Sequence, residues 1–117
     1  MTLIAYYSKT GNTRRFVEKL EQPAVEITPG LTLEQPFVLV TPTYNFGQVP
    51  EEVVEFIKFN HTNMLGVVGT GNIVWAQNFA KSADIISRQF SVPIIRKIEL
   101  SGTAQDVGYV KKWVEDC

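Results

Sequence analysis

The sequence predicts a doubly wound α/β domain, with a five-stranded, mostly parallel sheet in the order 2-1-3-4-5 and helices on both faces. Five apolar runs of strand length recur along the 117 residues, and helix-period segments separate most of them. The runs are apolar almost throughout, as is typical of strands that are buried on both faces. This order places ligands at the carboxyl ends of the strands. We expect a single domain spanning residues 1–117.

The expected strands cover residues 3–7, 24–27, 37–40, 64–68 and 92–100. Residues 28–36 hold two prolines and a glycine in too short a stretch for a packed helix, so we expect a plain connection there. Thr103 and Asp106 have the spacing of a capping box before the last helix. The residues expected to face inward from the four helices are Phe16, Val17 and Leu20; Val53, Val54, Phe56 and Ile57; Phe79, Ala83, Ile86 and Phe90; and Val107, Val110 and Val114.

Charge and cysteine content narrow the classes of partner. Eleven basic and 12 acidic residues give a net charge of -1, so we expect no nucleic-acid partner. No apolar run reaches 18 residues, so we expect no membrane association. The single cysteine, Cys117, forms no intramolecular disulfide and no metal cage. A cytoplasmic protein is the expectation.

The strongest local motif is SKTGNT, which joins the first expected strand to the first expected helix. The amides and dipole of a helix N-terminus favour an anion, and hydroxyl groups add neutral donors. The segment matches neither GxxxxGK[ST] nor GxGxxG. The same residue types also favour turns and helix caps. We predict a site for a bound monophosphate, formed by Ser8, Thr10, Gly11, Asn12 and Thr13.

Two further polar loops follow the third and fourth expected strands, at the same edge of the sheet. A planar redox ring needs aromatic or apolar walls and a few backbone hydrogen bonds, and Tyr44 and Trp75 suit the walls. A lone aromatic residue more often anchors a loop on the core, so the prediction depends on the combination of all three loops. The residues expected to line the ring site are Thr41, Pro42, Thr43, Tyr44, Asn45, Phe46, Gly47, Gly71, Asn72 and Trp75.

The motif SKTGNT resembles the phosphate loop of flavodoxins. The segments TPTYNFGQVPEEVVEF and GTGNIVWAQNFAKSAD resemble the ribonucleotide reductase stimulatory flavodoxins, the NrdI family, and the similarity covers nearly the whole chain. The short length, the absent crossover helix and the G-N-x-x-W pattern ending at Trp75 separate this group from the longer electron-carrier flavodoxins. The resemblance implies a flavodoxin-like fold.

The resemblance also implies a cofactor, partners and a role. The cofactor would be FMN, with its phosphate on the Ser8–Thr13 loop and its isoalloxazine between residues 44–47 and 72–75. Its reduced form would supply electrons or a reduced-oxygen oxidant such as superoxide. The oxidant would serve assembly of the dimanganese-tyrosyl radical cofactor in the radical-generating small subunit of class Ib ribonucleotide reductase. A flavin-reducing electron donor would be a second partner, and the chain would be an accessory factor without catalytic or metal-ligating residues of its own.

Three alternatives stay open at this point. A general single-electron-carrier flavodoxin shares the FMN site and differs in partner and potentials. A receiver-like signalling domain of similar topology needs acidic residues after the first strand, where this chain has Tyr6, Tyr7 and Ser8. A nicotinamide-dependent flavin reductase needs a second nucleotide site, for which 117 residues leave little material. Arg14 and Arg15 fit either a phosphate or partner contact, or a solvated helix face.

Overall fold

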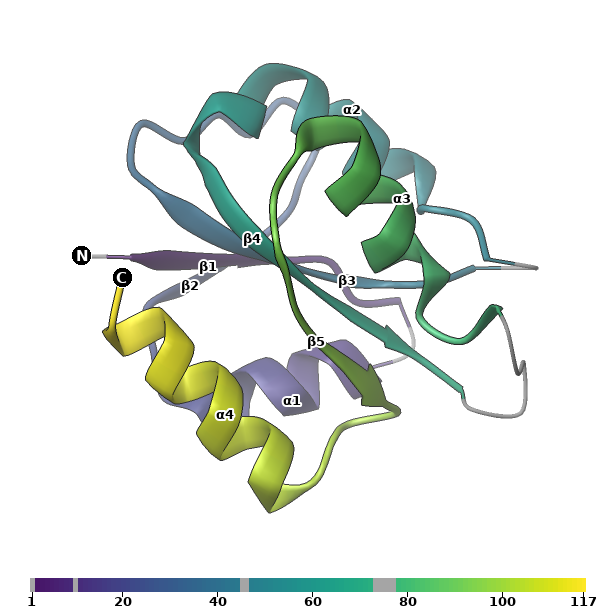
Figure 1. Ribbon diagram of the computed structural model, residues 1–117. Helices are drawn as coiled ribbons and strands as arrows, with labels where there is room; N and C mark the ends of the chain where they lie inside the picture. The colour runs from purple at the N-terminus through teal and green to yellow at the C-terminus, as the bar shows by residue number, and fades with distance from the viewer. Residues whose placement is uncertain (1, 10, 45–46, 73–77) are drawn as a thin grey trace.

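A computed structural model describes residues 2–9, 11–44, 47–72 and 78–117. The strands form one parallel sheet in the order β2-β1-β3-β4-β5, which confirms the predicted order and direction (Figure 1). The strands are β1 (Leu3–Tyr6), β2 (Ala24–Glu26), β3 (Phe37–Pro42), β4 (Met64–Gly71) and β5 (Ile94–Glu99). The helices are α1 (Asn12–Leu20), α2 (Glu51–Asn60), the 3-10 helix η1 (His61–Asn63), α3 (Lys81–Phe90) and α4 (Ala104–Glu115).

Helices cover both faces of the sheet, with α1 and α4 on one side and α2 and α3 on the other (Figure 1). The central strand β3 is buried by both layers, because Val38 and Val40 join the core beneath α1 and α4 whereas Leu39 joins the core beneath α2 and α3. All three are 0% exposed. Burial from both sides explains why this strand is apolar at consecutive positions rather than at alternate ones. Within the described ranges, no helix is both long and apolar enough to span a membrane.

One of the expected inward-facing residues is wrong, and another lies outside the helix that was expected to carry it. Val54 is 40% exposed, whereas Val53, Ile57 and Asn60 are buried. Val54 is one residue, or about 100°, beyond Val53 around the helix, which turns it away from the buried stripe. Phe79 precedes α3, which begins at Lys81. Strands β3 and β4 also run further than expected, to Pro42 and Gly71, so part of each predicted loop is strand.

The connection between β2 and β3 contains no helix, as predicted, and a buried side chain on α2 holds it in place. Asn60 is 1% exposed. Its Oδ1 accepts from the amide of Leu33 at 2.7 Å, and its Nδ2 donates to the carbonyls of Leu31 at 3.0 Å and Phe56 at 2.8 Å. A buried amide that makes three hydrogen bonds leaves no desolvated group unpaired. Asn60 therefore fixes the connection against α2.

The N-terminal end of α3 lies unusually close to β4. A Cβ on Gly69 would stand 2.8 Å from the Cβ of Ala83 and 3.0 Å from the carbonyl oxygen of Ala80. A Cβ on Gly71 would stand 2.9 Å from the amide nitrogen of Ala80. Only glycine permits this approach, so these glycines serve the packing of helix on strand. Their presence in the sequence is not evidence of a flexible loop.

Strand β5 forms one edge of the sheet and is flanked by ion pairs on both faces. Arg96 Nε lies 2.7 Å from Asp106 Oδ1 on α4, and Lys97 Nζ lies 2.6 Å from Asp84 Oδ2 on α3. Consecutive strand residues point to opposite faces, so each cation meets a different helix. The predicted capping box is confirmed, because the Thr103 hydroxyl accepts from the Asp106 amide and the Asp106 carboxylate accepts from the Thr103 amide. Asp106 thereby both caps α4 and holds it on the edge strand.

The close approach at Gly69 yields a paired prediction. Gly69→Ala is expected to lower the free energy of unfolding by about 1–3 kcal/mol, because the added methyl overpacks a rigid contact. Gly108 lies in α4 with nothing within 4 Å of an added Cβ, so it is the matched control. Gly108→Ala is expected to raise the free energy of unfolding by about 0.5–1 kcal/mol through helix propensity. Urea denaturation measures both, and equal effects of the two substitutions would contradict the packing argument.

Candidate functional site

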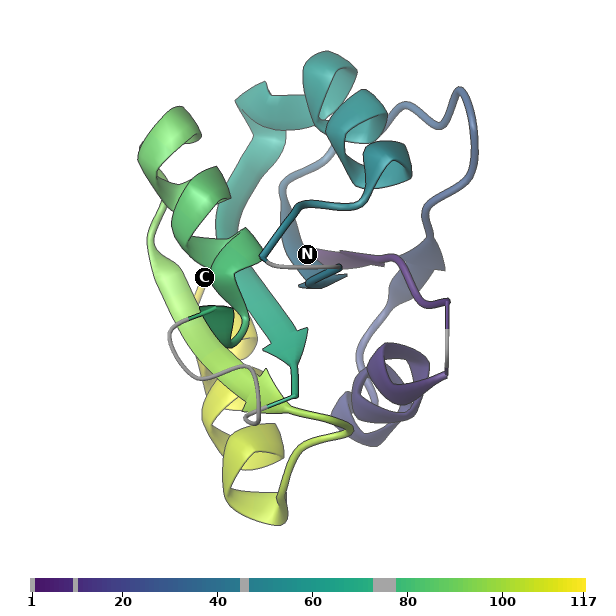
Figure 2. The same ribbon diagram turned by 90° about the vertical axis from the view of Figure 1, so that its right-hand side faces the viewer.

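The loops predicted from the sequence meet in one cavity at the carboxyl edge of the sheet. Figure 2 shows the molecule from this side, with the start of α1 and the ends of β3 and β4 around the same region. The cavity has a volume of about 230 Å³. It lies where the strand order reverses between β1 and β3, the usual ligand position in a doubly wound sheet. Its lining residues are Asn12, Thr13, Pro42, Thr43, Tyr44, Thr70, Gly71, Asn72 and Leu100.

The loop between β1 and α1 is shaped around Ser8. The Ser8 Oγ accepts hydrogen bonds from the amides of Gly11 and Arg14, each at 3.2 Å. Gly11 has φ 95°, a left-handed conformation that favours glycine. Helix α1 begins at Asn12 with no acidic residue in its first turn, and the first amides of a helix have no intrahelical acceptor. This end of the cavity is therefore electropositive and suited to an anion.

Two threonines that were predicted to contact the ligand are engaged within the protein. Thr13 is buried, and its hydroxyl lies 2.9 Å from the hydroxyl of Thr70 on β4, so the pair ties the start of α1 to the sheet. Thr41 is 0% exposed and donates its hydroxyl to the carbonyl of Pro42 at 3.0 Å. Thr13 still lines the cavity, whereas Thr41 lies beneath it. Thr70 and Leu100 also line the cavity and were not predicted to do so.

The loop after β3 is closed by its own backbone. The amide of Tyr44 donates to the carbonyl of Gln48 at 2.9 Å, and the carbonyl of Tyr44 accepts from the amides of Gly47 at 3.1 Å and Gln48 at 2.7 Å. Gly47 has φ 102°, and a Cβ there would lie 3.0 Å from Cδ of Lys81. The loop is thereby held at both ends against the start of α3.

A hydroxyl pair also joins this loop to α3. The Thr43 Oγ1 lies 2.8 Å from Ser82 Oγ and accepts from the Ser82 amide at 3.3 Å. Ser82 is fully buried. The side chain of Ser82 therefore has a structural role, because it fixes Thr43 at the cavity wall.

Tyr44, which was expected to be a wall of the ring site, lines the cavity. Lys9 Nζ lies 5.4 Å from the centroid of its ring, and the ring of Tyr7 meets it edge-on at 6.3 Å between centroids. Its hydroxyl is buried, and among the described residues it has no hydrogen-bond partner. Burial raises the pKa of Tyr44, so the hydroxyl stays protonated at neutral pH and keeps its donor.

A second tyrosine joins the cavity to α2. The Tyr7 hydroxyl donates to Glu52 Oε2 at 2.5 Å. This hydrogen bond, together with burial, raises the pKa of Tyr7 far above its ordinary value, and the same bond lowers the pKa of Glu52. Tyr7 and Glu52 are separated by 45 positions, and no sequence pattern links them, so this pair was not predicted.

The remaining predicted residues divide into two groups. Arg14 makes two 2.9 Å contacts to the carboxylate of Glu26, and Arg15 donates to Asn12 Oδ1 at 2.7 Å, so both have partners on or beside their own helix. Of the two alternatives, a solvated helix face with local partners describes them better. Thr10, Asn45, Phe46 and Trp75 were predicted to bind the ligand and lie outside the described residues.

Solved structures define the class of protein. The oxidised flavodoxin 1 of Bacillus cereus superposes with a TM-score of 0.70 at 14% identity, over 98% of this chain and 95% of that one. The flavodoxin of Fusobacterium nucleatum bound to flavin mononucleotide superposes with a TM-score of 0.67 at 15% identity, over 98% of this chain and 95% of that one. The chain therefore has the flavodoxin-like fold.

Sequence relatives define the family. The family model described as NrdI flavodoxin-like matches residues 4–112. Protein NrdI of Bacillus licheniformis is 47% identical over 116 residues, which cover 98% of this chain and 88% of that protein. The SPbeta prophage-derived protein NrdI of Bacillus subtilis is 43% identical over 108 residues, which cover 89% and 84%. The chain belongs to the NrdI flavodoxin-like family, which confirms the resemblance drawn from its motifs.

The contact between Tyr7 and Glu52 predicts a titration. Glu52→Gln is expected to lower the pKa of Tyr7 toward its ordinary value of 10.0, because the carboxylate favours the protonated phenol. A raised tyrosine pKa stabilises the fold fully below pH 10.0, and this stabilisation is lost as the pH rises further. The ring resonances of Tyr7, followed by NMR from pH 8 upward, measure the shift. Glu55→Gln on the same helix is the control, and an unchanged Tyr7 titration in Glu52→Gln would refute the assignment.

Proposed function

We propose that this protein binds FMN in the carboxyl-edge cavity and activates class Ib ribonucleotide reductase. In this role it supplies electrons or a reduced-oxygen oxidant for assembly of the dimanganese-tyrosyl radical cofactor in the small subunit. The observation that carries the proposal is the convergence of an anion-suited loop and an aromatic wall in one cavity of an NrdI-family chain. The radical-generating small subunit and a flavin-reducing electron donor are the proposed partners.

The anion-suited end of the cavity fits a phosphate monoester. The Ser8 Oγ organises the loop by accepting from the amides of Gly11 and Arg14. The start of α1 adds the positive end of a helix dipole without a nearby acidic residue in the first turn. Asn12 and Thr13 of this loop also line the cavity. These residues would hold the phosphate through backbone amides rather than through a fixed cation.

The other end of the cavity fits a planar ring. Pro42, Tyr44 and Leu100 give the cavity apolar and aromatic surface, and Gly71 and Asn72 add polar groups to its lining. Leu100 is held there by a 2.8 Å hydrogen bond from its amide to the carbonyl of Gly71. Walls of this kind with a polar backbone border suit a flavin.

In this proposal, FMN and the protein have separate roles. FMN supplies one- and two-electron transfer when it is bound. The chain would bind and orient it: the Ser8 loop would hold the phosphate, Tyr44 would line the ring site, and Tyr7, which bonds to Glu52, would support Tyr44 through an edge-on ring contact. A cytoplasmic location is proposed as well, since the only cysteine, Cys117, forms no intramolecular disulfide.

The phosphate role of Ser8 is testable with a matched ligand. Ser8→Ala is expected to raise the Kd for FMN roughly tenfold, because two loop amides lose their acceptor and the loop loses its shape. The affinity for riboflavin, which lacks the phosphate, is expected to stay within about twofold. Fluorescence titration of the apoprotein with both ligands measures the difference. Equal losses for FMN and riboflavin would mean that Ser8 supports the fold rather than the phosphate.

The role itself is tested by radical formation. The FMN-loaded protein, reduced without oxygen, is mixed with the manganese-loaded small subunit and then exposed to air. A tyrosyl radical seen by electron paramagnetic resonance is expected with this protein present, and none is expected when free FMN replaces it. A protein that binds and reduces FMN normally yet never supports the radical would instead be a general electron carrier. A protein that takes up no FMN would overturn the proposal as a whole.

A further inference from the structure

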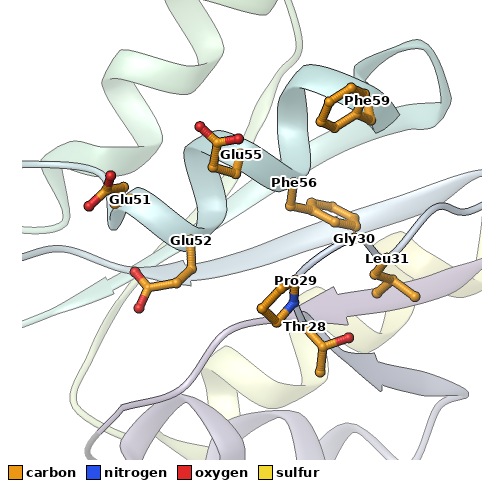
Figure 3. Close-up of a pocket in the computed structure, with 9 residues that line it drawn as sticks. All are labelled: Thr28, Pro29, Gly30, Leu31, Glu51, Glu52, Glu55, Phe56 and Phe59. Atoms are coloured by element: carbon orange, nitrogen blue, oxygen red, sulfur yellow. The ribbon is translucent and has the colours of Figure 1, made fainter.

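A larger groove lies along α2, next to the carboxyl-edge cavity but separate from it (Figure 3). Its volume is about 410 Å³. One side is the connection after β2, and the other side is α2. Figure 3 shows the glutamates toward one end of the groove and the phenylalanines toward the other. The lining residues are Thr28, Pro29, Gly30, Leu31, Glu51, Glu52, Glu55, Phe56 and Phe59.

The groove exists because the connection after β2 contains no helix and is held in one position. Two hydrogen bonds of Asn60, from the amide of Leu33 and to the carbonyl of Leu31, fix the connection to α2, and Asn63 Nδ2 adds a bond to the carbonyl of Leu33 at 3.0 Å. Three partly buried hydrogen bonds keep this wall in place. The groove is therefore preformed, which lowers the entropic cost of occupying it.

The apolar end of the groove presents a large aromatic ring to solvent. Phe59 is 72% exposed, the highest value among the large apolar side chains of the described residues that are classed as exposed. Together with Leu31, Pro29 and the edge of Phe56 it lines the right-hand part of Figure 3. Because Pro29, Leu31 and Phe56 line the same groove, Phe59 belongs to an apolar patch, and such a patch is typical of an interaction site.

The other end of the groove is acidic. Glu51, Glu52 and Glu55 line it, and none of the described residues that line the groove is basic. Glu51 and Glu52 also suit the dipole at the start of α2, but the dipole explains neither Glu55 nor Phe59. Glu55 pairs with Lys58 at 3.0 Å, and both side chains are more than half exposed, so this pair is worth little and a cation of a partner can replace Lys58. Lys9, which lowers the pKa of Glu52, lies over Tyr44 and does not line the groove.

We propose that this groove docks a segment of the protein partner in which a basic side chain stands beside an apolar anchor. The cation meets the three carboxylates, and the anchor packs against Phe59 and Leu31. This inference rests on the proposed function, because the partner is the protein that receives the electrons or the oxidant. Charge complementarity favours a basic segment over an acidic one, and the apolar end favours a protein segment over a small cation.

The groove and the carboxyl-edge cavity share a structural link. Glu52 lines the groove and accepts the hydrogen bond of Tyr7, whose ring meets Tyr44 in the cavity wall. A cation bound at Glu52 therefore lies two side chains away from Tyr44. Docking in this groove would bring a partner to the edge of the sheet where the cofactor is proposed to bind.

The test compares groove variants with variants on the opposite face. Binding of the FMN-loaded protein to the small subunit is measured by calorimetry and by stopped-flow association. Phe59→Ala is expected to raise Kd about tenfold or more, as for an aromatic anchor. The double variant Glu51→Gln, Glu55→Gln is expected to slow association severalfold at low salt, with less effect at high salt. The matched controls, Tyr109→Ala and the double variant Glu18→Gln, Glu115→Gln, lie on α4 and α1 and are expected to bind normally.

A second experiment does not depend on the identity of the partner. A short peptide of alternating lysine and leucine is titrated into the ¹⁵N-labelled protein, with a glutamate–leucine peptide as its control. The lysine peptide is expected to shift the amides of residues 28–31 and 51–59 and to lose this effect in Phe59→Ala.

The outcomes distinguish failure of the docking proposal from failure of the proposed function. If the small subunit binds the wild type, unchanged binding of both groove variants overturns the docking proposal and leaves the proposed function standing. If the small subunit does not bind the wild type, the proposed function falls and the peptide decides the groove. Shifts confined to the groove then support docking, and the absence of such shifts overturns it.

Discussion

The structure depends on one close contact, the approach of α3 to the end of β4 at Gly69 and Gly71. Because neither position carries a Cβ, the backbone of Ala80 and the methyl of Ala83 lie directly on the strand. Ala80 adopts a left-handed conformation with φ 49°, which an L residue occupies at a cost. The packed contact must offset that strain, so the first turn of α3 has little freedom to shift. The position of every loop at this edge follows from it.

From this fixed turn, hydroxyl pairs extend the constraint across the sheet. Ser82 holds Thr43 after β3, and Thr70 at the end of β4 holds Thr13 at the start of α1. Lys81 packs on Gly47 and limits the same loop from the other side. A cavity whose walls come from separate strand ends is thus assembled by short, largely buried contacts. Such an arrangement preorganises a binding site before any ligand arrives.

The sequence predicts the features that follow from local pattern, and these include the strand order, the missing crossover helix and the capping box at Thr103. It does not predict contacts that depend on packing. Gly69 and Gly71 resemble loop residues in sequence but belong to β4. Only the folded structure shows that α3 packs against them. Val54 is apolar yet points outward. The partners Tyr7 and Glu52 are 45 positions apart, and only the fold brings them together.

The absence of a crossover helix after β2 changes both how the connection is held and which surface of α2 stays exposed. A helix after β2 would have buried its own apolar stripe, whereas here one buried side-chain amide, that of Asn60, holds the connection with two hydrogen bonds. Since no helix of the described chain covers that side of α2, Phe59 stays 72% exposed. Glu52 stands at the other end of the same groove and touches Tyr7. The feature that shortens the chain therefore also leaves open a surface connected to the cavity wall.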